Sequence, residues 1–62
     1  MNRIKAVREE KGITQQELAN RVSVSRPYIV DLEKGRRGAK PETWARIAEA
    51  LGVQVDELRE AG

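Results

Sequence analysis

Apolar residues recur three or four positions apart along most of the chain, which is the spacing that places them on one face of an α-helix. In the first such stretch Ile4 and Val7 mark this face, with Ala6 as a weaker candidate. Asn2 precedes the stretch and can cap a helix, and a glycine follows Lys11. We therefore predict a first helix that ends at about Lys11.

Residues 13–22 predict a second, short helix. Thr14 and Glu17 have the spacing of a capping box, in which each side chain satisfies a free backbone N–H at the helix start. Ile13 is expected to fill the turn before this helix. The apolar face that should pack on the core consists of Leu18, Ala19 and Val22.

A third helix follows after a short connection. Ser25 can act as its N-cap, and Pro27 fits the first turn, where a missing N–H costs no helical hydrogen bond. Gly35 can adopt the left-handed conformation that ends a helix. We therefore predict a helix over about residues 25–34. The two capped helices and their short turn form a helix-turn-helix over about residues 14–35.

The rest of the chain predicts two more helices after a glycine-containing loop. Pro41 fits the first position of a helix that ends at Gly52. The predicted buried stripe of this helix is Trp44, Ile47, Ala48 and Leu51. A short final helix then contains Leu58. The residues before these two helices, Lys40 and Gln54, lack the short oxygen-bearing side chains that cap best.

The third predicted helix has two different faces when its residues are placed about 100° apart around the axis. One face is apolar and should pack on the core: Tyr28, Ile29 and Leu32. The other combines charged and apolar side chains: Arg26, Pro27, Val30, Asp31 and Lys34. Such a face suits the major groove of DNA, which offers hydrogen-bond acceptors, thymine methyl groups and cytosine amino donors. We interpret it as a recognition face.

Composition limits the chain to one small domain over residues 1–62. At this length only about 60% of the unfolded surface is buried on folding, so we expect modest stability. Only 3% of residues are aromatic, so the core must consist of Ile, Val, Leu and Ala, with Trp44 as its largest member. The chain has no Cys, no long apolar run and no signal peptide, which favours a cytoplasmic protein without disulfides.

Charge is distributed unevenly, although the net charge is only +2. Residues 20–40 carry six basic and two acidic side chains, a net charge of +4, whereas residues 41–62 carry two basic and five acidic ones, a net charge of −3. The basic part coincides with the helix-turn-helix and the loop after it. High charge also keeps small proteins in solution, but this coincidence favours a polyanionic partner.

The sequence does not indicate an enzyme. His and Cys are absent, and there is no glycine-rich phosphate loop and no carboxylate cluster with metal-ligand spacing. We therefore predict no catalytic residue, no metal site and no cofactor. The competing hypothesis is a protein-interaction module, or an antitoxin that uses the same fold to bind a toxin as well as its own operator.

Three segments in this order carry a further signal: IKAVREEKGITQQELANRVSVSRPYIVDLEKGRR, ETWARIAEALGV and VDELRE. Over residues 3–59 the chain resembles the DNA-binding domain of the Cro/C1-type phage repressors and their bacterial relatives, the XRE-like regulators. The resemblance implies an all-α fold, a compact five-helix bundle whose second and third helices form the helix-turn-helix. It also implies a repressor-like transcriptional regulator of double-stranded DNA.

Regulators of this kind usually bind pseudo-palindromic operators as dimers, with one recognition helix in the major groove of each half-site. The resemblance therefore implies that the helix over residues 25–34 enters the major groove. The chain is too short for a separate dimerisation domain, so we expect a weak homodimer or a monomer that pairs on DNA. The candidate dimer contacts are Val53, Val55 and Leu58.

Four residues of the recognition face are expected to touch bases. Arg26 should form a bidentate pair with guanine, worth about 1–3 kcal/mol of discrimination, or else contact a phosphate. Pro27 and Val30 should contact a thymine methyl group. Asp31 is unusual, because relatives often have Arg, Gln or Asn there. It could accept from a cytosine amino group, hold Arg26 or Lys34 in place, exclude wrong sequences, or indicate a chain that does not bind DNA.

Contacts with the DNA backbone are expected from two helix starts, from the end of the third helix and from the loop after it: Gln15, Ser25, Lys34, Arg36, Arg37 and Lys40. Arg21 is a weaker candidate. For the three loop residues the alternative is an ordinary solvated basic loop. By resemblance, Arg8 and Glu33 form a structural salt bridge behind the third helix, which would orient that helix.

Overall fold

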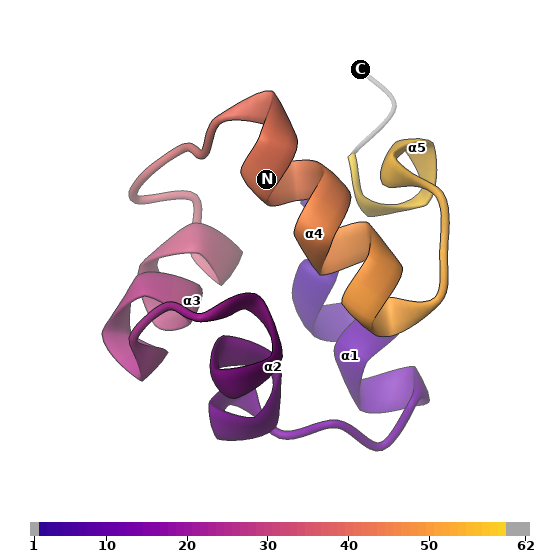
Figure 1. The fold of residues 1–62 in the computed structure, drawn as a ribbon, viewed down its shortest axis with the longest axis horizontal. Coiled ribbons are helices and arrows are strands. Elements are labelled where there is room, and N and C mark those ends of the chain that lie inside the picture. Colours follow the sequence, from indigo (N-terminus) through magenta and orange to yellow (C-terminus); the bar gives the residue numbers. More distant parts are fainter. Residues whose placement is uncertain (1, 60–62) are drawn as a thin grey trace.

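The computed structural model describes residues 2–59, which form an all-α bundle (Figure 1). The helices are α1 Ile4–Glu10, α2 Gln15–Val22, α3 Arg26–Glu33, α4 Pro41–Leu51 and α5 Val55–Leu58. The predicted five-helix fold is therefore confirmed, with helix ends within a residue or two of those expected. Within the described range, no helix is long and apolar enough to cross a membrane.

The capping residues start α2 and α3 where the sequence predicts. The Glu17 N–H donates to Thr14 Oγ1 at 3.0 Å, and the Thr14 N–H donates to Glu17 Oε1 at 3.1 Å, which completes the capping box. Ser25 Oγ accepts from the Tyr28 N–H at 3.2 Å. Gly35 follows α3 with φ of +73°, a conformation that costs little only for glycine. Local chemistry thus sets both ends of the helix-turn-helix.

The starts of α4 and α5 differ from each other. Lys40 provides no side-chain cap for α4, as expected, and Pro41 occupies its first turn. At α5 the carboxylate of Glu57 accepts from the Gln54 N–H at 2.7 Å. The start of α5 is therefore capped by Glu57, a residue within the helix. The weak capping ability of Gln54 alone does not predict this cap.

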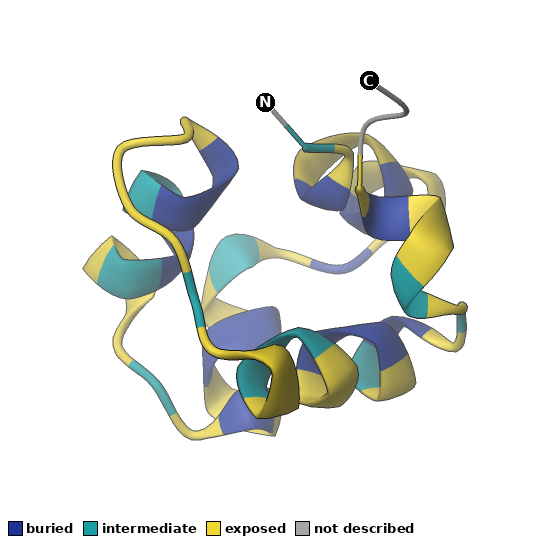
Figure 2. Cartoon of the chain, turned by 90° about the horizontal axis from the view of Figure 1, so that it is seen from above, coloured by how far each residue is buried: buried dark blue, intermediate teal, exposed yellow. Residues whose placement is uncertain are grey.

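The buried apolar residues come from all five helices and from the turn before α2 (Figure 2). They are Ile4, Val7, Ile13, Leu18, Ala19, Val22, Ile29, Leu32, Ile47, Ala48, Leu51 and Leu58. Two expectations are wrong. Ala6 is exposed, because it lies about 100° around the helix from Val7 and on the side away from the core. Trp44 is only half-buried, and the Arg59 guanidinium lies 5.7 Å from its ring centre.

The two ends of the described chain meet next to the end of α3. Arg3, not Asn2, occupies the N-cap position of α1, but Asn2 Oδ1 accepts from the Ile4 N–H at 3.1 Å and so satisfies a free donor at the helix start. Its Nδ2 donates to the Leu32 carbonyl of α3 at 2.8 Å. The Arg3 N–H donates to the Leu58 carbonyl at 2.8 Å, and Asn2 pairs with Arg59 as an isolated antiparallel bridge. The first residues thus hold both α3 and α5.

Candidate nucleic-acid interface

The turn between α2 and α3 fixes how the two helices pack. Ser23 ends α2 in the left-handed conformation with φ of 60°, the only positive φ of a non-glycine residue within residues 2–59. The Val24 N–H then donates to the Ala19 carbonyl at 3.0 Å, and the half-buried Val24 side chain packs against the core. The chain therefore leaves α2 abruptly, and Ser25 can start α3 at once.

A buried ion pair lies behind α3. Arg8 Nε lies 2.7 Å from Glu33 Oε2, and the exposed fractions of the two side chains are 9% and 3%. Arg8 Nη2 donates to Glu33 Oε1 at 3.5 Å, and Arg8 Nη1 donates to the Ile13 carbonyl at 2.8 Å. The structure thus contains the pair that the family resemblance implies. It links α1, the turn before α2 and the end of α3.

Gln15 extends this pair to the recognition face. Its Nε2 donates to Glu33 Oε1 at 3.0 Å, and its Oε1 accepts from Arg26 Nε at 3.4 Å. Because Glu33 accepts from the amide nitrogen, the amide oxygen is turned toward Arg26. A continuous chain of hydrogen bonds therefore runs from the Arg8 guanidinium to the first residue of α3. The sequence predicts Gln15 only as a contact of the DNA backbone, because no local pattern indicates a partner 18 residues away.

The recognition face of α3 is accessible over most of its length. Arg26, Pro27 and Lys34 are exposed, and Val30 is half-buried. Asp31 is also half-buried, and its Oδ1 lies 3.9 Å from Arg36 Nη1. Of the alternatives for Asp31, the one in which it holds Arg26 or Lys34 in place is therefore not the arrangement found, because its ionic partner is Arg36.

Arg36 reaches Asp31 because the loop folds back beside α3. The Arg36 N–H donates to the Asp31 carbonyl at 2.9 Å, directly after the left-handed Gly35. The exposed fractions of the Arg36 and Asp31 side chains are 66% and 44%, so water screens the pair and it adds little to stability. It does place a basic side chain beside the carboxylate on the recognition face, which reduces the repulsion between Asp31 and a phosphate.

The loop between α3 and α4 adds further positive charge at the same side of α3. Arg36, Arg37 and Lys40 are exposed. The Arg37 guanidinium carbon lies 4.0 Å from the centre of the Tyr28 ring. An open hollow lies next to this contact and is lined by Val24, Tyr28, Arg37, Gly38, Ala39, Lys40 and Thr43. The loop thus offers two cations, Arg37 and Lys40, around one hollow, and Thr43 of α4 adds a hydroxyl group.

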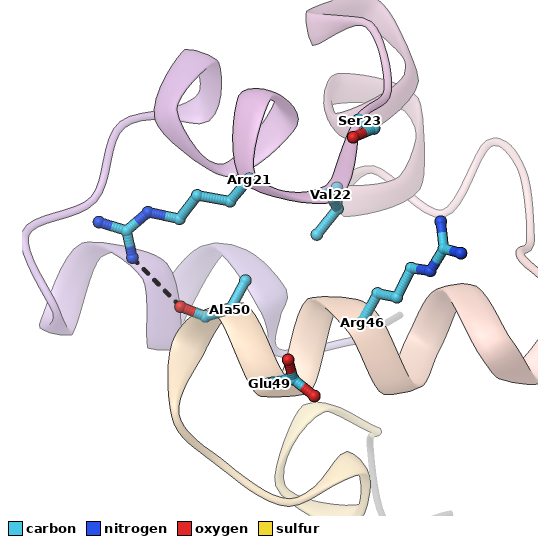
Figure 3. A pocket seen from close by; sticks show the side chains of 6 residues that line it. All are labelled: Arg21, Val22, Ser23, Arg46, Glu49 and Ala50. Carbon is cyan, nitrogen blue, oxygen red and sulfur yellow. Dashed lines mark hydrogen bonds between the residues drawn. The ribbon is translucent and has the colours of Figure 1, made fainter.

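Arg21 points away from the recognition face of α3 and from the loop that follows it. Figure 3 shows its guanidinium over the end of α4, where Nη1 donates to the Ala50 carbonyl at 3.2 Å. The same view places Arg46 and Glu49 on the facing side of α4, around a separate hollow between α2 and α4. The weaker expectation of a DNA contact by Arg21 is therefore not supported by its position.

One expected dimer contact is wrong. Leu58 has an exposed fraction of 0% and is part of the core, so it is not available to a second copy. Its carbonyl is held by the Arg3 N–H, which keeps α5 folded against the rest of the chain. Val53 and Val55 are half-buried and pack partly against the core.

The capping box also changes one ionisation equilibrium. The N–H of Thr14, and to a lesser extent its hydroxyl group, hold the pKa of Glu17 below its usual range, while desolvation slightly opposes this shift. The positive charge of Arg21 also lowers the pKa of Glu17, by a smaller amount. Glu17 is therefore ionised at neutral pH, which suits its position in the first turn of α2.

Comparisons with known proteins agree with this geometry. The family model described as Helix-turn-helix matches residues 4–58. The immunity repressor protein of Bacillus phage phi105 is 41% identical over 56 residues, which is 90% of this chain and 39% of that protein. The HTH-type transcriptional regulator DdrOP3 of Deinococcus deserti is 34% identical over 58 residues, 94% of this chain and 45% of that protein. The chain thus spans less than half the length of these two relatives.

A solved structure shows the same fold. The crystal structure of the restriction-modification controller protein C.AhdI from Aeromonas hydrophila superposes with a TM-score of 0.84 and 29% sequence identity. The match covers 89% of this chain and 83% of that one. The family model and the two relatives match the sequence of nearly the whole chain, and the solved structure matches its arrangement of helices. The chain belongs to the Cro/C1-type, XRE-like family of helix-turn-helix proteins.

Proposed function

We propose that this chain is the sequence-specific DNA-binding domain of a repressor-like transcriptional regulator, and that α3 enters the major groove of its operator. The observation that carries this proposal is the hydrogen-bonded chain from Arg8 through Glu33 and Gln15 to Arg26. It holds an exposed arginine at the start of a helix whose outer face is otherwise free. The names of the relatives, an immunity repressor and a transcriptional regulator, support the same function.

Base recognition is assigned to the exposed face of α3. Arg26 forms a bidentate pair with guanine, and Pro27 and Val30 contact thymine methyl groups. Asp31 accepts from a cytosine amino group or excludes sequences that leave its carboxylate unpaired. These assignments follow from the side chains that α3 exposes and from the chemistry of the groove.

Backbone contacts are assigned to residues around α3: Gln15, Ser25, Lys34, Arg36, Arg37 and Lys40. Ser25 Oγ already accepts from the Tyr28 N–H, so its own hydroxyl proton is the group that donates to a phosphate. These contacts position the helix and supply the salt-dependent part of the affinity. They carry no sequence information by themselves.

A homodimer on a pseudo-palindromic operator completes the proposal. Half-sites of such operators lie about one helical turn apart. Val53 and Val55, which are half-buried near the end of α4 and the start of α5, are the remaining candidate contacts. A small interface of this kind fits a weak dimer that DNA stabilises.

The first experiment is a selection of bound sequences from random duplex DNA with the wild type and with Arg26→Ala at one salt concentration. We expect a two-fold symmetric motif for the wild type and a lost guanine preference for the variant. A steep decrease of affinity with salt should accompany binding, because phosphate contacts release counterions. No enriched motif and a flat salt dependence would instead favour the protein-interaction hypothesis.

A further inference from the structure

Tyr28 and Arg37 form a contact between α3 and the loop that follows it. The Arg37 guanidinium carbon lies 4.0 Å from the Tyr28 ring centre, within the distance of about 6 Å at which a cation is attracted to an aromatic face. Tyr28 is half-buried and packs against the hydrophobic core, whereas Arg37 is exposed. The ring therefore provides a fixed support for a long and otherwise mobile side chain.

The two partners are held very differently by their backbones. The Tyr28 N–H donates to the capping oxygen of Ser25, which fixes the first turn of α3. Arg37 lies in the loop between Gly35 and α4, outside any helix. A long side chain in such a loop loses considerable rotamer freedom when a ligand fixes it. Stacking on Tyr28 removes part of that cost before any ligand arrives.

The surroundings of the stacked pair suit an anion. Lys40 and Thr43 line the hollow beside it, so an anion there meets two cations and a hydroxyl group. The Arg36 N–H donates to the Asp31 carbonyl at 2.9 Å, which holds the start of the loop against α3. The loop and the recognition helix are thus connected through the backbone, through the Asp31–Arg36 ion pair and through the Tyr28 ring.

We propose that Tyr28 is a positioning residue: its ring holds the Arg37 guanidinium where it meets a DNA phosphate. This inference rests on the proposed function, because it requires that the chain binds DNA. Ordering one long side chain on binding costs about 0.5–1.5 kcal/mol, which equals a factor of about two to ten in affinity. Loss of the ring should therefore weaken DNA binding by this factor.

A double-mutant cycle tests the proposal on the selected operator at one salt concentration. The variants are Tyr28→Leu, Arg37→Ala, both together, and Tyr28→Phe as the matched control. Tyr28→Leu alone should weaken binding about two- to tenfold, and it should have no further effect when Arg37 is already replaced. Tyr28→Phe should bind like the wild type, because it keeps the aromatic face.

Two results of the cycle overturn the proposal. An equal loss from Tyr28→Leu with and without Arg37 assigns Tyr28 a purely structural role. A loss in Tyr28→Phe as large as that in Tyr28→Leu indicates that the hydroxyl group contacts DNA directly. If the wild type binds no duplex at all, the proposed function itself fails, whereas a wild type that binds without this coupling removes only the role of Tyr28.

A second measurement needs neither DNA nor a destabilised variant. In the free wild type, ring current should shift the side-chain protons of Arg37 upfield in the NMR spectrum. The shift should persist in Tyr28→Phe. If the upfield shift is absent in the wild type, the Tyr28 ring does not support the Arg37 side chain and the proposal is overturned. This result does not depend on whether Tyr28→Leu folds.

Discussion

Gln15 Nε2 lies 3.0 Å from Glu33 Oε1, so the carboxylate of a buried ion pair sets the orientation of an amide on the recognition side of the molecule. The amide oxygen in turn accepts from Arg26 at 3.4 Å. Gln15 is assigned to no base, but it orients Arg26, so we expect it to affect which base Arg26 contacts. This connection makes separate predictions for stability and for specificity.

Replacing Gln15 should affect DNA binding more than folding. In Gln15→Leu, Arg26 loses its acceptor while Glu33 keeps Arg8, so the free energy of unfolding should fall by only about 1 kcal/mol. The affinity for the selected operator should fall about two- to tenfold, because Arg26 is no longer ordered before binding. Affinity for a scrambled duplex should fall less, so the ratio of the two affinities is the quantity to measure.

Gln16→Leu is the matched control for this prediction. Gln16 is the next residue of α2, is exposed, and donates to Asn20 at 3.0 Å without touching the ion pair. Its replacement should leave the affinity ratio unchanged. Equal losses of specificity in both variants would contradict the role of Gln15.

Removing Glu33 should destabilise the fold strongly. Glu33→Ala leaves the Arg8 guanidinium buried without its partner, and breaking such a pair costs about 3–5 kcal/mol. In a domain of this size each kcal/mol lowers Tm by about 4–8 °C, so thermal unfolding followed by circular dichroism should show a large shift. The double variant Arg8→Met with Glu33→Leu should recover much of the loss, since apolar side chains of similar volume need no partner. An unchanged Tm in Glu33→Ala would contradict a structural role of the Arg8–Glu33 pair.

The capping box predicts a pH dependence of stability. Since the pKa of Glu17 is lowered in the folded state, its ionised form contributes stability that is fully present above the unfolded pKa of about 4.3. This contribution is lost as pH falls through the lower folded pKa. Glu17→Gln keeps a capping acceptor but does not titrate. The Tm difference between wild type and Glu17→Gln should therefore shrink between about pH 6 and pH 3, and parallel curves would contradict the assignment.

Leu58 should act on stability within a single chain. Leu58→Ala removes a fully buried side chain, which costs about 2–5 kcal/mol in a core. The loss should be the same at low and high protein concentration in urea unfolding. Val55→Ala is the comparison, because Val55 is only half-buried. If Leu58→Ala lowers the free energy of unfolding only at high protein concentration, Leu58 contributes to the dimer interface instead.

Local patterns were enough to predict most of the fold. Thr14 with Glu17 and Ser25 with Pro27 set the starts of α2 and α3 through atoms only a few residues apart, so the sequence alone predicts them. The ion pair of Arg8 with Glu33 spans 25 residues and was predicted only through the resemblance to a family. Periodicity could not have indicated it.

Apart from Ala6, whose own position around α1 explains its exposure, the expectations that the structure contradicts share one physical cause. Each concerns a side chain whose environment is decided by a residue far away in the sequence or by the path of a loop. Trp44 stays half-exposed next to Arg59, and Asp31 meets Arg36 because the chain turns back after Gly35. Leu58 is buried because the first residues of the chain hold α5. Amphipathic spacing gives the face of a helix but not what covers it.

The contacts of the first residues have a consequence for the order of folding. The Asn2 side chain joins the Leu32 carbonyl across 30 residues, and the Arg3 N–H joins the Leu58 carbonyl near the opposite end of the chain. Closing long loops costs more entropy than forming the α2–α3 pair, whose contacts are local. We expect the chain to open from its joined ends while the pair stays folded. In native-state hydrogen exchange the Arg3 amide proton should then exchange well before that of Val24.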